Sequence, residues 1–450
     1  EKIYNLDYDL LTINQENVNP INIGAYSSQD TSSGVLYGDD ASIASSPNGG
    51  HGIFVTGSLG NQNSITGPLT FIGGSGIIKR NESSIAAHGG AGLFLDNINI
   101  SITNVNFLGG LGGINIRRFE QDAYGQDGHG IEWQVDEGNS SFLNLVGSSI
   151  TNGIDINSAE GAILDFSYTN TIIVGGIDKT GEGELYINSH DENSLEDLDI
   201  QNGSVIFSDN LIIGGTEQIN LSSIGSSLIA SNGLSLVGGI SGSGTIEIYN
   251  DMEISGILNG ILTVDLASIS NSLTLKPGYS INGVTFNAEG TQDSLVFEEN
   301  GTYNADALGM NTTFADFESV QLSDLSDTWE GINSFNYIIE GGASLDDTFA
   351  FSSSGTYSSD DFISITNNIS GFESYGLSSG DDIWIAKVND VSLGSFIRGR
   401  SGEDTISFLE YRPDSTEIGS TYIDFEGALL ESGTNTWHNT SDYSQLQFVD

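Results

Sequence analysis

The chain has 450 residues, of which 61 are acidic and 11 are basic, giving a formal net charge of −50. A surface this acidic repels nucleic acid and anionic membranes and attracts divalent cations, so we expect no nucleic-acid partner. The chain has no cysteine, which excludes a disulfide scaffold, a cysteine zinc site and a catalytic thiol. No apolar run approaches the roughly 20 residues of a membrane-spanning helix, so we expect no membrane insertion.

Residues 1–25 are predicted to cap or extend the fold, and residues 26–285 form a glycine- and asparagine-rich region. In this region short apolar runs of strand length alternate with Gly, Asn and Asp, as in GLFLDNINISITNVNFLGG from Gly92 to Gly110. The cadence restarts after roughly 20 residues, which is typical of a β-solenoid. The sequence therefore predicts an all-β fold. A solenoid is favoured over a sandwich because consecutive segments resemble each other.

The segment RRFEQDAYGQDGHGIEW, residues 117–133, is unusual in a chain with so few bases. We interpret it as a long turn that protrudes from the solenoid, with its arginines paired to local carboxylates. The alternative is a hydrolase site, because acid/base hydrolysis of glycans needs two carboxylates at a defined separation. The candidate side chains for that site are Asp122, Asp127, His129 and Glu132.

The region from residue 286 to residue 450 contains three repeats of about 55 residues, which either continue the solenoid or form a second β domain. Each carries a Phe-Glu/Trp segment: FESVQLSDLSDTW from Phe317, FESYGLSSGDDIW from Phe372 and FEGALLESGTNTW from Phe425. Unchanged spacing of Phe, Leu and Trp predicts repeated packing, with Phe and Leu pointing inward and Trp at a fixed corner. Three copies of a sugar-stacking site are the alternative interpretation.

Acidic turns precede strands in these repeats, as in SLDDTFAF, SGDDIWIA and SGEDTISF. Asp at such turns can bind Ca²⁺ together with backbone carbonyls, or it can simply cap the backbone. The candidate Ca²⁺ ligands are Asp346, Asp347, Asp381, Asp382, Glu403 and Asp404.

The motifs GGHGIFV, AAHGGAGLFLDNINI and DGHGIEW resemble the passengers of bacterial autotransporter and filamentous-haemagglutinin-like surface proteins. The acidic turns resemble degenerate RTX-like beta strand repeats of large secreted bacterial proteins. The resemblance implies a right-handed parallel β-helix, an extracellular or cell-surface location and an adhesive or structural role.

From these observations we expect an extracellular structural or adhesive solenoid that is not an enzyme. We expect it to assemble with copies of itself into a filament, sheath or lattice supported by Ca²⁺, and a cell-surface glycan or host surface is a further possible partner. Basic clusters are expected to meet the acidic surface of a neighbour; they consist of Lys79, Arg80, Arg117, Arg118, Arg398 and Arg400. The rival hypotheses are a β-helix carbohydrate-active enzyme or glycan-binding spike, and an adhesin that never polymerises.

Overall fold

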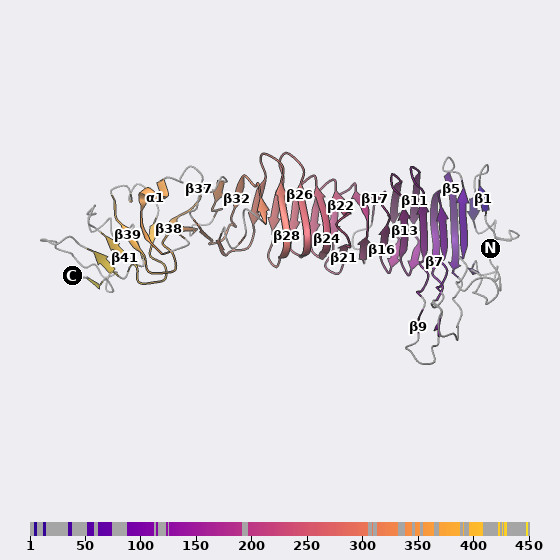
Figure 1. Cartoon of the computed structure of the whole chain (residues 1–450), viewed down its shortest axis with the longest axis horizontal. Helices are drawn as coiled ribbons and strands as arrows, with labels where there is room; N and C mark the ends of the chain where they lie inside the picture. The colour runs from indigo at the N-terminus through magenta and orange to yellow at the C-terminus, as the bar shows by residue number, and fades with distance from the viewer. Residues whose placement is uncertain are drawn as a thin grey trace. The chain divides into compact units, whose positions relative to one another are not determined.

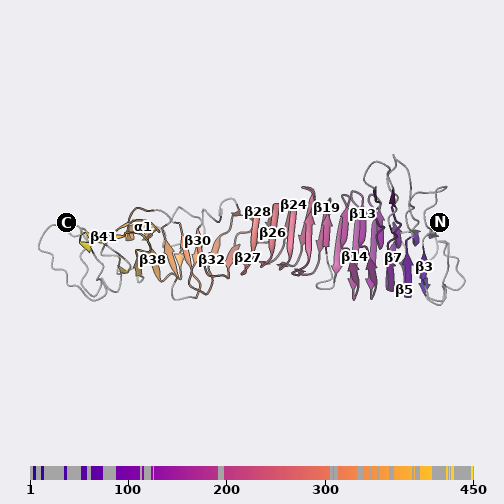
Figure 2. The same cartoon turned by 90° about the horizontal axis from the view of Figure 1, so that it is seen from below.

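The computed structural model is nearly all β and consists of short parallel strands wound into coils, so the predicted parallel β-helix is confirmed. Figures 1 and 2 show these strands lying side by side in successive coils. The structure describes residues 4–6, 12–14, 35–37, 52–57, 62–73, 88–111, 114–115, 123–124, 126–190, 197–304, 308, 313–331, 338–343, 347–351, 354–363, 369–387, 390, 396–407, 422–423, 425, 427–429 and 447–448. In that part of the chain, no helix is long and apolar enough to cross a membrane.

The chain divides into two compact units. Unit 1 comprises residues 1–250, 255–265 and 280–284, and unit 2 comprises residues 251–254, 266–279 and 285–450. The first 25 residues supply strands β1 (Tyr4–Leu6) and β2 (Thr12–Asn14), which pair in parallel with strands of later coils.

Each coil of unit 1 has three faces. The first face contains β1, β4 (Ile53–Gly57), β6 (Leu93–Asp96), β10 (Ile131–Val135), β13 (Ile154–Ser158), β16 (Ile177–Thr180), β18 (Asp197–Ile200) and β21 (Gln218–Leu221). The second contains β2, β5 (Gln62–Ile72), β7 (Asn99–Leu108), β11 (Ser140–Val146), β14 (Ile163–Thr169), β17 (Glu184–Ser189), β19 (Gly203–Phe207) and β22 (Ser226–Ala230). The third contains β3 (Val35–Tyr37), the later parts of β5 and β7, β12 (Ser149–Thr151), β15 (Ile172–Val174), β20 (Leu211–Ile213) and β23 (Leu234–Leu236). β24 (Gly239–Ile248) pairs with both β21 and β22, and β26 (Ile257–Leu266) and β28 (Ser280–Ala288) contribute residues to both units.

Side chains in these strands alternate between the interior and the surface, as the period of two residues requires. In β10, for example, Ile131, Trp133 and Val135 are buried while the residues between them are not. Because strands in neighbouring coils pair in register, like side chains stack along the interior. Phe71 stacks on Phe107 in this way, with ring centroids 5.5 Å apart.

Unit 2 is also a three-sided solenoid, and we name its sheets X, Y and Z. Sheet X contains β25 (Met252–Ile254), β27 (Ser272–Leu275), β29 (Ser294–Phe297), β32 (Ser319–Gln321), β34 (Ile338–Glu340) and β37 (Ile369–Ser370). Sheet Y contains β30 (Thr302–Asn304), β33 (Thr328–Glu330), β35 (Thr348–Ala350), β38 (Ser374–Gly376), β40 (Phe396–Arg398) and β42 (Tyr422–Ile423). Sheet Z contains β36 (Thr356–Ser358), β39 (Ile383–Ile385), β41 (Thr405–Ser407), β43 (Gly427–Leu429) and β44 (Gln447–Phe448). β31 (Phe314–Ala315) pairs with β28, and the short helix α1 (Ser359–Ile363) follows β36.

The Phe-Glu/Trp segments are packing units, as the spacing predicts, but the expected position of Trp at a fixed corner is wrong, because Trp329 and Trp384 are the central residues of β33 and β39. Phe317, Phe372 and Phe425 are buried, and Trp329 and Trp384 are completely enclosed. The corresponding Leu322 and Leu377 also lie in the core. Trp437 lies outside the described residues. The described aromatic rings of these segments are therefore core residues and are not exposed sugar-stacking platforms.

Candidate functional site

A row of carboxylates runs along the first face of unit 1. Glu132 of β10 lies beside Asp155 of β13, Asp155 lies beside Asp178 of β16, and Asp178 lies beside Asp199 of β18. Neighbouring strands in a sheet are about 4.8 Å apart, so each Cα lies roughly one strand spacing from the next. We call these four residues the carboxylate ladder.

The strands position the ladder through the same alternation that builds the core. The residues on either side of each carboxylate point inward, so the carboxylates face outward and are half-buried. The row continues with Asn220 of β21, whose side-chain amide donates a hydrogen bond of 3.0 Å to Oδ1 of Asp199. Ser222 donates a second bond to the same oxygen. Asp199 is therefore held in place by the next coil.

The ladder carries electrostatic strain. Burial raises the pKa of Glu132, and the neighbouring Asp155 raises it further, while His129 acts in the opposite direction. Burial also raises the pKa of Asp155 and of Asp178 above the usual value for aspartate, and His129 again opposes the shift. His129 thus partly compensates three of the four carboxylates. Burial of Glu132, Asp155 and Asp178, with a smaller contribution from neighbouring acids at Glu132 and Asp178, disfavours the charged folded state at neutral pH. Strain of this kind is typical of functional positions.

We expect the carboxylate ladder to make unit 1 more stable at mildly acidic pH than at pH 7. Because the folded pKa values are raised, the folded chain binds protons that the unfolded chain has released. The free energy of unfolding should rise as pH falls through the folded pKa values, and the gain should be complete below the unfolded values of about 4. The double variant Glu132→Gln/Asp155→Asn should be about 1 kcal/mol more stable than the wild type at pH 7 and should lose much of this pH dependence.

Urea unfolding at pH 5 and pH 7, followed by the fluorescence of the buried Trp133, measures this difference. Glu160→Gln, at an exposed position outside the ladder, is the matched control and should change neither value appreciably. A double variant that is less stable than the wild type at pH 7 would contradict the assignment of strain to the ladder.

The glycines of the GHG motif have a packing role. A Cβ on Gly128 would lie 2.1 Å from the carbonyl oxygen of Gly90, and one on Gly130 would lie 2.6 Å from the carbonyl oxygen of Thr151. Neither clash can be relieved by rotating a side chain, because both neighbours are backbone atoms. The motif therefore needs glycine for close contact between coils, and His129 is its partly exposed residue.

The structure brings together only part of the hydrolase constellation that the sequence suggested. His129 and Glu132 are close enough to interact, and Asp127 is exposed. Asp122, Arg117 and Arg118 lie outside the described residues. On either side of them in the sequence, β8 (Ile114–Asn115) and β9 (Ala123–Tyr124) form an antiparallel pair, and both strands come between β7 and β10 in the chain.

Sequence reasoning missed Asp155, Asp178 and Asp199. A signal for them was present, because the four ladder carboxylates follow one another at intervals of 23, 23 and 21 residues. Those intervals match the length of a coil, and acidic residues repeated at the coil length must stack on one face.

In unit 2, the buried aspartates at the sheet corners accept hydrogen bonds from the backbone. Oδ1 of Asp347 accepts from the N–H of Asp327 at 2.8 Å, and Oδ1 of Asp404 accepts from the N–H of Asp382 at 2.9 Å. Oδ1 of Asp382 accepts from the N–H of Gly355 at 2.5 Å. In each case the carboxylate of one coil binds the amide of the coil before it. We call Asp327, Asp347, Asp382 and Asp404 the corner carboxylates.

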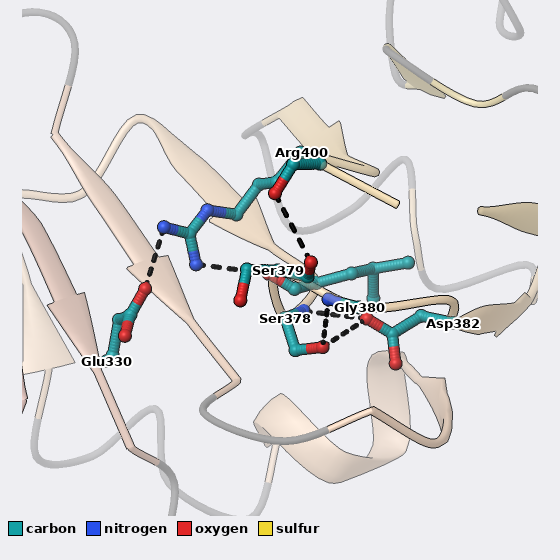
Figure 3. A network of polar contacts seen from close by, with 8 residues as sticks. Glu330, Ser378, Ser379, Gly380, Asp382 and Arg400 are labelled. Atoms are coloured by element: carbon teal, nitrogen blue, oxygen red, sulfur yellow. Dashed lines mark hydrogen bonds and ion pairs between the residues drawn. The ribbon is translucent and has the colours of Figure 1, made fainter. Parts of the chain in front are cut away.

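The other oxygen of Asp382 binds its own turn. Oδ2 accepts from the backbone N–H of Ser378 at 2.8 Å and from the Ser378 hydroxyl at 2.7 Å, as Figure 3 shows. Asp327 makes the same pair of contacts with Ser323 one repeat earlier. Of the predicted Ca²⁺ ligands, Asp347, Asp382 and Asp404 are therefore buried backbone acceptors.

The two remaining described candidates for Ca²⁺ binding, Asp381 and Glu403, are exposed, and Oδ1 of Asp381 accepts from the backbone N–H of Glu403 at 2.9 Å. Asp346 lies outside the described residues. The part of the chain that the structure describes contains no group of three or more His, Asp or Glu side chains placed to hold a metal ion. Calcium binding at these turns stays a prediction, and Asp381 and Glu403 are the candidates still exposed to solvent.

Of the basic residues predicted to contact a partner, Arg400 makes its contacts within the chain. Its Nη2 forms an ion pair of 2.7 Å with Glu330 (Figure 3), and its Nη1 donates to the carbonyl of Leu377 at 3.3 Å. The side chain passes Gly376, where a Cβ would lie 2.8 Å from Cδ of Arg400. Arg398 lies in β40 and is half-buried. Lys79, Arg80, Arg117 and Arg118 lie outside the described residues.

We expect Arg400→Ala to destabilise unit 2 by about 1–2 kcal/mol, because the arginine covers Gly376 and neutralises a half-buried Glu330. The double variant Arg400→Ala/Glu330→Gln should recover part of the loss, since it removes the carboxylate left without its partner. Thermal unfolding of the wild type, the two single variants and the double variant checks this. A purely additive double variant would show that the ion pair contributes nothing.

Comparison with family models, with curated proteins and with solved structures found no match. The resemblance to autotransporter passengers and RTX-like repeats therefore stays a prediction from the motifs.

Proposed function

We propose that this protein is an extracellular structural or adhesive solenoid that assembles with further copies of itself into a surface filament, sheath or lattice. The observation that carries the proposal is that buried carboxylates hydrogen-bond the backbone of neighbouring coils. In unit 2, the corner carboxylates bind successive coils to one another through the backbone, while aromatic and aliphatic side chains fill the interior. This organisation supports a rigid scaffold, which is what a structural subunit or adhesin needs.

The acidity of the chain supports a role for divalent cations in assembly. A surface of charge −50 repels another copy of itself unless the charge is screened or bridged. The exposed pair Asp381 and Glu403 could contribute to such a bridge. The basic clusters at residues 79–80 and 117–118 are the proposed contacts with the acidic surface of a neighbouring copy.

Electron microscopy of the purified protein in millimolar Ca²⁺, and again after chelation, tests this function. We expect regular filaments or sheets that disperse on chelation. The charge-reversal variant Arg117→Glu/Arg118→Glu should weaken assembly, while the control Lys276→Glu, which changes the same kind of charge elsewhere, should not. Single dispersed particles in both conditions would overturn the proposal of self-assembly.

The carboxylate ladder favours a second candidate function, the hydrolysis or binding of a glycan. Glu132 and Asp155 lie on adjacent strands, at a backbone spacing close to the roughly 5 Å that separates the two carboxyl groups of retaining glycosidases. A raised pKa suits Glu132 to the role of general acid, and Asp155 would then act as the nucleophile.

A screen of polysaccharides for released reducing ends distinguishes the two functions. If the ladder is catalytic, Glu132→Gln and Asp155→Asn should each reduce the rate by at least about 10²-fold, whereas Glu160→Gln should not. Binding without turnover would support a glycan-binding surface. No binding and no turnover on any polymer would leave the structural function as the conclusion.

A further inference from the structure

Equivalent residues of the three repeats in unit 2 lie on successive sheets of the solenoid. Asp293 precedes β29 in sheet X, Asp347 precedes β35 in sheet Y, and Asp404 precedes β41 in sheet Z. The tryptophans of the first two repeats also lie on successive sheets. Trp329 lies in sheet Y, whereas Trp384 lies in sheet Z.

The hydrogen bonds between coils also lie one sheet further on in the second repeat than in the first. In sheet X the N–H of Asp293 donates to Oε2 of Glu318 at 2.7 Å, and in sheet Y the N–H of Asp347 donates to Oε2 of Glu373 at 3.0 Å. These glutamates belong to the Phe-Glu pairs that open the repeated segments. The Phe-Glu pairs that begin at Phe317 and Phe372 therefore each place a phenylalanine in the core and a carboxylate on the amide of the previous coil.

The same relation holds for the corner carboxylates. Sheet Y contains a column in which Gly301 donates to Asp327, and Asp327 donates to Asp347. Sheet Z contains the equivalent column one repeat later: Gly355 donates to Asp382, and Asp382 donates to Asp404. From Asp293 the chain returns to sheet X at β32 and again at β34, which completes two coils, and it then continues one face further to β35 of sheet Y. One repeat is thus two complete coils plus one face.

We propose that the 55-residue repeat is a self-contained module that turns by one third of a coil with each copy, so that whole copies can be added or removed without breaking the bonds between coils. The repeat, and not the coil, is then the unit of insertion. The exposed turns that end at Asp327 and Asp382 also lie on different sides, since Asp324 lies before sheet Y and Asp381 lies before sheet Z. A partner that recognises this turn would meet it on a different side of unit 2 in each copy.

Two deletions in the full chain test whether the repeat or the single coil is the unit of insertion. Deletion of residues 347–403 removes one whole repeat and places Asp404 where Asp347 stood, next to the amide of Asp327. Deletion of residues 348–373 removes one coil of sheet Y, keeps the strands in step, and removes both Glu373 and the Gly355 donor of Asp382. We expect the whole-repeat deletion to keep the urea midpoint within about 0.5 M of the wild type and to keep the amide of Asp327 protected from exchange. The coil deletion should lower the midpoint by more than 1 M and expose the amide of Asp347.

Duplication of residues 347–403 tests the module without removing any residue. The duplicated chain should unfold at a midpoint no lower than that of the wild type, with a correspondingly larger β signal in circular dichroism. Equal tolerance of the coil deletion and the whole-repeat deletion would overturn the proposal, because the coil would then be the unit. Loss of Asp327 protection in both the deletion and the duplication of a whole repeat would overturn it as well.

Discussion

Asp382→Ala should be one of the most destabilising single substitutions in unit 2, lowering the free energy of unfolding by about 3–5 kcal/mol. Asp382 is 1 % exposed, and its carboxylate accepts from the backbone N–H of Gly355, the backbone N–H of Ser378 and the Ser378 hydroxyl. Alanine would leave these donors without an acceptor where water has little access. Each buried donor that loses its partner costs about 1–3 kcal/mol. Urea unfolding followed by tryptophan fluorescence measures the loss, because Trp384 is fully buried in the adjoining strand.

The neighbouring Asp381 provides a matched control. It is the same residue type in the same turn, but it is exposed and accepts a hydrogen bond from the backbone N–H of Glu403. Asp381→Ala should therefore cost less than about 1 kcal/mol in the absence of Ca²⁺. Asp382→Asn should lie between the two, because an amide keeps one oxygen and replaces the other with a donor. Equal destabilisation by Asp381→Ala and Asp382→Ala would contradict the role assigned to burial.

Lys179→Met should destabilise unit 1 by about 2–4 kcal/mol at pH 7. Lys179 points inward from β16, is completely buried, and donates to the carbonyls of Thr180, Gly181 and Asn202 at 3.0, 2.9 and 3.3 Å. Methionine has a similar volume but no donor, so three carbonyls of two coils would lose their partner. The loss of these charge-assisted bonds should outweigh the gain from no longer burying a charge.

The pH dependence gives a second measurement on the same variant. Burial lowers the pKa of Lys179 to about 8, from the usual 10.5. Between these values the unfolded chain binds a proton that the folded chain has released, so the free energy of unfolding of the wild type should rise with pH relative to Lys179→Met. The full difference between the two pKa values corresponds to about 3 kcal/mol. Lys276→Met, which removes a half-buried lysine paired with Glu253, should show no such rise. A flat difference between wild type and Lys179→Met from pH 7 to pH 10 would show that the amine is not strained by burial.

The position of Lys179 illustrates what sequence patterning cannot resolve. Its register partners in the neighbouring coils are Ile156 and Ile200, so the lysine occupies a place in an aliphatic column. Alternation along the strand predicts an inward side chain there, but a lysine is expected at the surface. Only the convergence of three carbonyls at one corner makes the inward position favourable, and those carbonyls come from two different coils.

The carboxylate ladder is only partly predictable from the sequence, because its spacing can be read there but its strand register and burial cannot. Its coil-length spacing was visible in the sequence, and His129 and Glu132 were recognised as chemically unusual. The pairing of Glu132 with Asp155 and Asp178 depends on strand register, which a shift of one residue would reverse. The raised pKa values also require burial by the surrounding coils, and composition carries no information about it.

For this protein, the sequence by itself determined the fold class, because short alternating strands, glycine and asparagine corners and a coil-length cadence permit little besides a parallel β-helix. The unchanged spacing also predicts that Phe, Leu and Trp pack inside, as they do in the segments that begin at Phe317 and Phe372. The tertiary structure alone decided the roles of the acidic residues. Asp381 and Asp382 are adjacent in sequence, yet one is exposed and the other is enclosed, since side chains on either side of a corner point in different directions. It also decided that each repeat advances by one sheet, because the path of the chain around the solenoid depends on the geometry of every coil and not on the length of the repeat.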